Sequence, residues 1–169
     1  SGEDDPSWRI DPLLTELISG LEAAEDACIP AYMKAIWSTA GKAGEKAKPE
    51  VLANVMEAMF GFLDDDNDTY RLGAAKALAA TCKHLGEDEL DELLVSRVFA
   101  EEAGVPWQAN AGRASVLHHL FFEAPEKILG EKYAGRAVET IASLVASDNT
   151  TVVGTALAAG AVAASCIIV

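Results

Sequence analysis

Aromatic residues and positive charges are both scarce in this sequence. Aromatic side chains make up 7% of the 169 residues, and 13 Lys and Arg stand against 27 Asp and Glu, for a formal net charge of −14. Nucleic-acid binding depends on neutralising phosphates with Lys and Arg, so this balance argues against direct nucleic-acid binding. It also argues against adsorption to an anionic membrane. A basic surface on another protein is the more natural charged partner.

Cysteine is also rare. Cys28, Cys82 and Cys166 are odd in number, lie far apart and form no C-x-x-C spacing. This pattern favours three buried thiols in a reducing compartment over a disulfide framework. The opening residues, SGEDDPSWRI, are acidic where a secretory signal peptide would be basic. We therefore expect a cytoplasmic protein.

Complete catalytic or metal-binding motifs are missing as well. The stretch LDDDNDTY resembles the opening of a calcium loop, but Thr69 and Ala75 stand where such a loop needs glycine and glutamate. We interpret it as an acidic turn that caps the next helix. His119 and Glu123 share a helix face, yet two ligands do not make a metal site, and no His-Glu dipeptide of HEAT-like iron hydroxylases is present. The sequence predicts no metal, no cofactor and no enzymatic activity.

Three alanine-rich stretches repeat in one register. They are NDTYRLGAAKALAATC from Asn67, PWQANAGRASVLHHLF from Pro106 and DNTTVVGTALAAGAVA from Asp148. Gly73, Gly112 and Gly154 occupy the same position in each, which suggests close approach of paired helices, because only a missing Cβ lets backbones come together. A weaker copy, DACIPAYMKAIWSTAGKAG, precedes them, and the spacing of about 40 residues is typical of HEAT or armadillo repeats.

A second helical stretch precedes each copy. These stretches are DPLLTELISGL, KPEVLANVMEAMFGFL, EDELDELLVSRVFAEE and EKYAGRAVETIASLVA. Their apolar residues recur at spacings of three and four, the stripe of an amphipathic helix. Pro12 and Pro49 are predicted at first helical positions. Gly44 and Gly86 are predicted to end helices in a left-handed conformation.

The sequence therefore predicts an all-α protein, a right-handed α-solenoid of about four HEAT-like helix pairs. We expect a single segment with repeats at roughly residues 9–44, 48–86, 87–124 and 131–169. The predicted inward-facing residues are Leu52, Val55, Met59, Leu78, Cys82, Leu93, Leu117, Phe121, Ile141 and Leu144.

The final stretch, Thr151 to Val169, contains no charge and is long enough to span a membrane. Its Ala, Gly, Thr and Ser residues insert weakly, and it aligns with two other repeat helices, so we expect a buried solenoid helix and no membrane partner. A terminal repeat normally has a polar outer face, and this one ends SCIIV. We therefore expect a piece of a longer array, with end-to-end self-association through Ile167, Ile168 and Val169.

Candidate partner-binding residues lie on the second helix of each pair, which usually lines the concave face of a solenoid. Lys34 and Lys76 occupy equivalent positions, and Lys83 follows two turns later. Arg71 could instead reach an acidic turn of the adjacent repeat, and Trp107 could be a packing anchor between repeats. The full set of candidates is Lys34, Tyr70, Arg71, Lys76, Lys83, Trp107 and Asn110.

The order of these motifs resembles a known family. The helix entry from Asp66 to Arg71, the passage from Cys82 to Leu90, Trp107 and the Gly112–Arg113 pair together resemble the C-terminal HEAT region of a large translational activator of general amino-acid control (general control non-derepressible one). The likeness covers about residues 30–169.

That resemblance implies a non-catalytic scaffold associated with the ribosome, which activates the kinase of the initiation-factor-two alpha subunit. The kinase or ribosomal proteins are then the expected partners. The family's kinase-docking region lies before the stretch matched here, so no known contact residue carries over. The alternatives are a HEAT scaffold of transport, phosphatase or chromosome machinery, and a HEAT-like metal-dependent enzyme.

Overall fold

The computed structural model of the chain describes residues 7–168, which form helices and no strand, so the all-α prediction is confirmed. The α-helices are α1 Ser7–Glu22, α2 Ile29–Ala43, α3 Pro49–Phe60, α4 Asp68–Cys82, α5 Glu87–Leu93, α6 Trp107–Glu123, α7 Pro125–Ile128, α8 Ala134–Val145 and α9 Thr150–Ile168. Short 3₁₀ turns at Asp26–Cys28 and Gly44–Lys46 and a π-helical turn, η3 at Leu94–Val98, join them.

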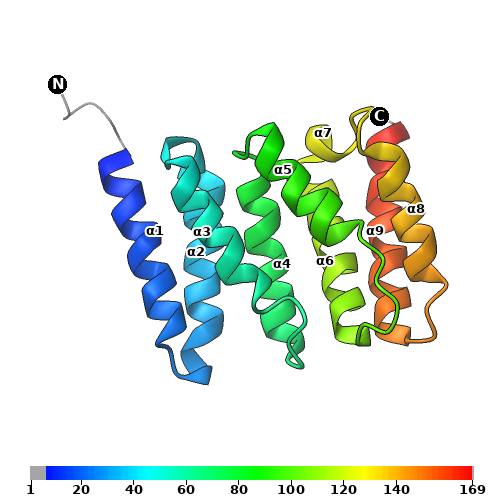
Figure 1. Ribbon diagram of the computed structural model, residues 1–169, viewed down its shortest axis with the longest axis horizontal. Helices are drawn as coiled ribbons and strands as arrows, with labels where there is room; N and C mark the ends of the chain where they lie inside the picture. The colour runs from blue at the N-terminus through cyan, green and yellow to red at the C-terminus, as the bar shows by residue number, and fades with distance from the viewer. Residues whose placement is uncertain (1–6, 169) are drawn as a thin grey trace.

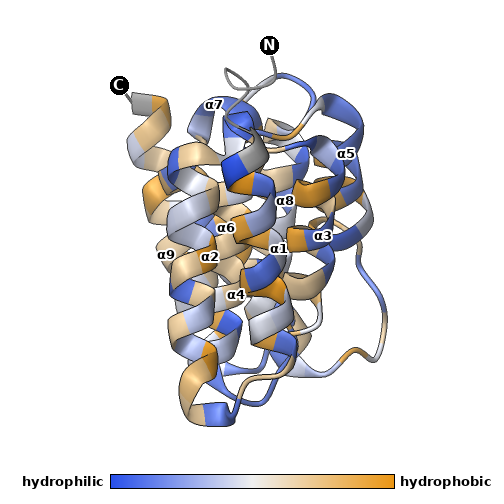
Figure 2. Cartoon of the chain, turned by 90° about the vertical axis from the view of Figure 1, so that its left-hand side faces the viewer, coloured by the Kyte–Doolittle hydropathy of each residue, from blue (hydrophilic) through white to orange (hydrophobic). Residues whose placement is uncertain are grey.

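The helices form a solenoid of two layers. The pairs α1/α2, α3/α4, α5/α6 and α8/α9 follow one another along the long axis (Figure 1). The first helices of the pairs form one layer and the second helices form the other, so that α2 and α9 lie on one side and α3 and α5 on the opposite side (Figure 2). Within the second layer, α2 contacts α4, α4 contacts α6, and α6 contacts α9. The repeat bounds given above stay a prediction.

Helix α4 lies between α2 and α6 in the second layer, and ten of its fifteen residues are buried. Asn67 caps its start, because the Asn67 Oδ1 accepts a hydrogen bond of 2.9 Å from the Thr69 amide. Alanine, the best helix former, supplies most of its middle. Ala74, Ala75 and Ala77 are fully buried, and their small side chains let the neighbouring helices approach closely.

The core lies between the two layers. Of the predicted inward-facing residues, Leu52, Val55, Met59, Leu78, Cys82, Leu93, Leu117, Phe121 and Leu144 are buried. Ile141 is half-buried and packs against the edge of this core. The apolar spacing of three and four residues therefore identified the inward faces of the helices correctly.

Several predicted helix boundaries are wrong. Helix α1 begins at Ser7 and contains Pro12, whereas Pro49 does begin α3. Gly44 has φ −60° because α2 continues into a 3₁₀ turn, and Gly86 is extended because it serves as the N-cap of α5. Within residues 7–168, the glycine with positive φ is Gly104, in the loop before α6.

Two of the three glycines in register are needed for packing. A Cβ on Gly112 would overlap the Leu63 carbonyl oxygen and lie 2.8 Å from Leu63 Cγ, in the turn after α3. A Cβ on Gly73 would lie 2.6 Å from Met33 Sδ on α2. At Gly154 nothing lies within 4 Å of an added Cβ, so the packing explanation is wrong there.

We expect Gly112→Ala and Gly154→Ala to have opposite effects on the free energy of unfolding. The first forces a Cβ against backbone and should lower stability by roughly 1–3 kcal/mol, as overpacking does. The second removes a flexible residue from a helix without a clash and should raise stability by about 0.5–1 kcal/mol. Urea unfolding followed by circular dichroism measures both. A Gly112→Ala protein as stable as the parent would refute the close-approach explanation.

Helix α9 is covered on one side only. Val152, Ala156 and Ala159 are buried, but Leu157 is 56% exposed and Ile167 is 65% exposed. The prediction of a buried helix is therefore wrong for its outer side. By length and composition, residues 150–167 could cross a membrane, with 22% of that window buried. Val169 and the side chain of Ile168, also predicted to drive self-association, lie outside what the structure describes.

Self-association through α9 stays a prediction, and a double variant tests it. Placing Glu at Leu157 and Ile167 should shift the isolated chain towards monomer in sedimentation velocity while helix content stays unchanged, because charge opposes burial of that face. Val138→Glu changes an equally exposed residue on α8 and is the matched control. A parent chain that is strictly monomeric at high concentration, or that floats with liposomes, would contradict this prediction.

Candidate partner-binding groove

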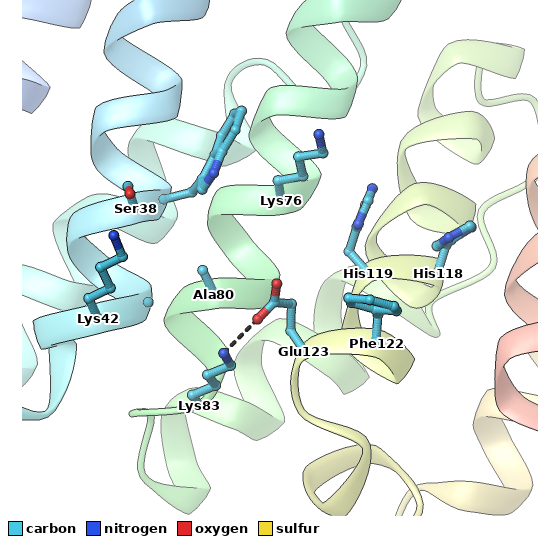
Figure 3. Close-up of a pocket in the computed structure, with 11 residues that line it drawn as sticks. Ser38, Lys42, Lys76, Ala80, Lys83, His118, His119, Phe122 and Glu123 are labelled. Carbon is cyan, nitrogen blue, oxygen red and sulfur yellow. Dashed lines mark ion pairs between the residues drawn. The ribbon is translucent and has the colours of Figure 1, made fainter. Parts of the chain in front are cut away.

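A groove crosses three helices of the second layer. Its lining includes Trp37 and Lys42 from α2, Lys76 from α4, Lys83 at the end of α4, and Phe122 from α6, around a cavity of about 580 Å³. Because α2, α4 and α6 pack side by side, residues more than one repeat apart in the sequence face the same space. In Figure 3 the lysines of α2 and α4 and the labelled residues of α6 surround this space.

The groove combines cations with aromatic rings. The Lys76 Nζ lies 5.0 Å from the centroid of the Trp37 ring, within the range of a cation–π interaction. The Lys83 Nζ lies 2.5 Å from Glu123 Oε2, an ion pair between α4 and α6. Phe122 is 74% exposed, unusual for a large apolar side chain. The groove thus offers positive charge beside an uncovered aromatic surface.

The two histidines of the groove form no metal site with Glu123. Glu123 pairs with Lys83, and the His118 and His119 rings lie 5.1 Å apart. Burial lowers the pKa of His119 to about 4, helped by nearby His118 and Lys76 and opposed by Glu123, so His119 is neutral at pH 7. Within the described residues, no group of three or more His, Cys, Asp or Glu is placed to hold a metal ion.

Another group of predicted residues lies at the seam between repeats. Arg71 is buried, donates a 2.5 Å hydrogen bond to the Asp65 carbonyl and pairs with Asp68. Its guanidinium carbon lies 4.9 Å from the centroid of the Trp107 ring, which is 37% exposed. Burial lowers the Arg71 pKa, and Asp65 and Asp66 oppose that shift. Arg71 thus bonds the turn before its own helix, not that of the adjacent repeat, and reaches the next repeat through Trp107.

Tyr70 and Asn110 are also engaged within the fold. The Tyr70 hydroxyl donates a 3.0 Å hydrogen bond to the Asp26 carbonyl, and its ring packs edge-on against Phe62. The Asn110 Oδ1 accepts a 3.0 Å hydrogen bond from Arg113 Nη1. These contacts give both residues a structural role at the helix ends.

The predicted partner-binding residues therefore lie in different places in the structure. It brings Lys76 and Lys83 together in the groove and places Tyr70, Arg71, Trp107 and Asn110 near the seams. Lys34 is exposed on α2, two turns before Lys42 and on the same helix face, outside the groove lining.

Sequence reasoning missed Trp37, Lys42 and Phe122. The sequence did contain a sign that the two aromatic side chains face outward. Each directly follows an apolar residue of the inward face, Ile36 or Phe121, both buried in the structure. Adjacent residues on a helix point about 100° apart, so Trp37 and Phe122 fall outside the inward stripe.

The histidine titration gives a testable prediction. An unfolded His119 protonates near pH 6.5 and the folded one near 4, so the unfolded chain binds more protons in between, and stability falls as the pH drops through this window. We expect this loss to be smaller in His119→Gln. Two-dimensional NMR of the imidazole should give a midpoint near 4; a midpoint near 6.5 would contradict the burial of this ring.

Comparison with known proteins agrees with this architecture. Residues 11–165 match the family described as "Stalled ribosome sensor GCN1-like, HEAT repeats". The chain belongs to this family. The resemblance inferred from the motif order is confirmed, and the helix pairs are HEAT repeats of the GCN1-like kind.

Individual relatives of the chain agree with this family assignment. The human protein "Stalled ribosome sensor GCN1" is 28% identical over 142 residues, covering 83% of this chain and 5% of the relative. The "eIF-2-alpha kinase activator GCN1" of Saccharomyces cerevisiae is 25% identical over 146 residues, which cover 83% of this chain and 5% of the relative. "Protein ILITYHIA" of Arabidopsis thaliana is 25% identical over 123 residues, which cover 73% of this chain and 4% of the relative. No solved structure matches the chain. The chain thus spans about one twentieth of the length of these relatives.

Proposed function

We propose that this chain is a non-catalytic, protein-binding segment of a GCN1-like scaffold, which works in the cytoplasm in the response to stalled ribosomes that activates the eIF-2-alpha kinase. The observation that carries the proposal is the groove across α2, α4 and α6, which brings three lysines together with the exposed ring of Phe122. Such a surface suits contact with a protein. The names of the human and yeast relatives, a stalled ribosome sensor and an eIF-2-alpha kinase activator, support this role.

The environments of the side chains that could take part in catalysis favour a non-catalytic role. Burial strongly raises the pKa of the Cys82 thiol, so its reactive thiolate is disfavoured. Glu123 is held in an ion pair with Lys83, and burial, together with nearby Lys76, opposes protonation of His119. We therefore propose no cofactor and no metal for this segment, and the HEAT-like enzyme is the weaker alternative.

The proposed partners are the kinase or ribosomal proteins, bound without direct contact to nucleic acid and without a membrane. A HEAT scaffold of another pathway would have the same fold but a different partner, and the family match favours the ribosome-linked role.

A retention experiment tests this function. The chain is coupled to beads and exposed to extract from amino-acid-starved cells, and ribosomal proteins and the kinase are detected separately. We expect at least one of them to be retained, also after RNase treatment, because the contact is with protein. Beads carrying an unrelated acidic protein of the same net charge control for charge alone. Retention of neither, or retention that RNase abolishes, would contradict the proposal.

A further inference from the structure

Charge is divided between the two helix layers. Helices α2 and α9 contain no Asp or Glu, α4 contains Asp68 alone, and α6 contains Glu123 alone. Helix α5, in the other layer, contains five acidic residues. The net charge of −14 therefore hides a second layer whose charged side chains are mainly cations.

Three lysines of the second layer line the groove. Lys42, Lys76 and Lys83 come from two neighbouring helices and line the same cavity, and Glu123 is the one carboxylate in that lining. The Lys83–Glu123 pair lies at the surface, with side chains 33% and 37% exposed. Because exposed ion pairs contribute little stability, a carboxylate from a partner can share Lys83 at small cost. Positive charge is thus available to an anionic ligand.

The apolar part of the groove favours an anionic ligand that also carries a large apolar group. The Phe122 ring projects from α6 on the groove side (Figure 3) and is largely exposed, while Trp37 supports Lys76 from α2. An exposed aromatic side chain beside cations gives a contact for a large apolar group that sits next to carboxylates. Fully buried apolar anchors ringed by polar contacts are typical of protein-binding sites.

We propose that this groove binds a short acidic peptide segment of another protein. Its carboxylates pair with Lys42, Lys76 and Lys83, and one large apolar side chain packs against Phe122. This inference rests on the proposed scaffold function and names the chemistry of the partner. It reverses the expectation of a basic partner that the net charge suggested.

An acidic peptide fits better than a nucleic acid. Binding to a phosphate backbone draws on many Lys and Arg contacts. The groove has three lysines, its His119 is neutral at pH 7, and the opposite helix layer is acidic. A long polyanion would meet repulsion beyond the groove, whereas a short peptide stays within the cationic region.

Titration of the chain with a fluorescent peptide tests the inference. The probe is rich in Asp and Glu and carries one central Trp; a second peptide has the acids replaced by Asn and Gln, and a third has Trp replaced by Ala. At physiological salt we expect the chain to bind the first peptide and neither of the other two. In the protein, Lys42→Glu, Lys76→Glu and Phe122→Ala should each lower the affinity for the first peptide roughly tenfold or more, because each removes one recognised contact.

Lys46→Glu is the matched control, since Lys46 is exposed just after α2 and outside the groove lining. It changes net charge as much as Lys42→Glu and should leave affinity nearly unchanged. Circular dichroism confirms that each variant keeps its helices. Equal losses in Lys46→Glu and Lys42→Glu, no binding of the acidic peptide, or preferential binding of a single-stranded RNA of similar length would each overturn the inference. If peptide binding fails while beads still retain ribosomal proteins or the kinase, the scaffold function stands and the groove assignment falls.

Discussion

Close packing between successive second helices is the interaction on which the other features of this structure depend. Half of the ten buried residues of α4 are alanine, and Gly73 lies where a Cβ would meet the Met33 side chain of α2. Small residues at these positions let the neighbouring second helices approach closely. The larger apolar residues, such as Leu78 and Phe121, are then available to fill the space between the two layers.

This close spacing also creates the groove. Lys76 on α4 can reach the Trp37 ring on α2, and Lys83 can reach Glu123 on α6, because adjacent second helices lie side by side. Larger side chains between the helices would move these groups apart and leave each charge without its partner. In repeat proteins each unit contacts its neighbours alone, so a binding surface of this kind arises from stacking order and not from a single motif.

Periodic apolar spacing made much of the fold predictable. The amphipathic stripes identified the inward faces of α3 and α5, and the register of the alanine-rich stretches predicted the helices of the second layer. The helix ends were harder to predict, because tertiary contacts decide them. Pro12 lies inside α1, although proline favours the first position of a helix. Gly44 lies against the His84 ring, with Cδ2 2.5 Å from where a Cβ would be, and this contact is not visible in the local sequence.

The candidate site was predictable only in part. Lys76 and Lys83 could be placed on one helix face by their spacing, but their aromatic and anionic partners come from other repeats. For Arg71 and Trp107 the sequence left partner contact and a structural role both open, and the structure joins the two residues at the seam between repeats. Net charge could not locate the cations, because an average over the chain hides the division between an acidic layer and one whose charged residues are mainly cations.

The central role of packing between second helices is tested most directly by enlarging one buried alanine. Leu and Ala differ little in helix propensity, so Ala77→Leu, at a fully buried position of α4, changes packing and little else. Measured by urea unfolding beside Ala161→Leu, at an exposed position of α9, it should lower the free energy of unfolding by roughly 1–3 kcal/mol while the control changes it little. Equal stability of Ala77→Leu and the parent would show that α4 has room to spare and would contradict close packing as the basis of the fold.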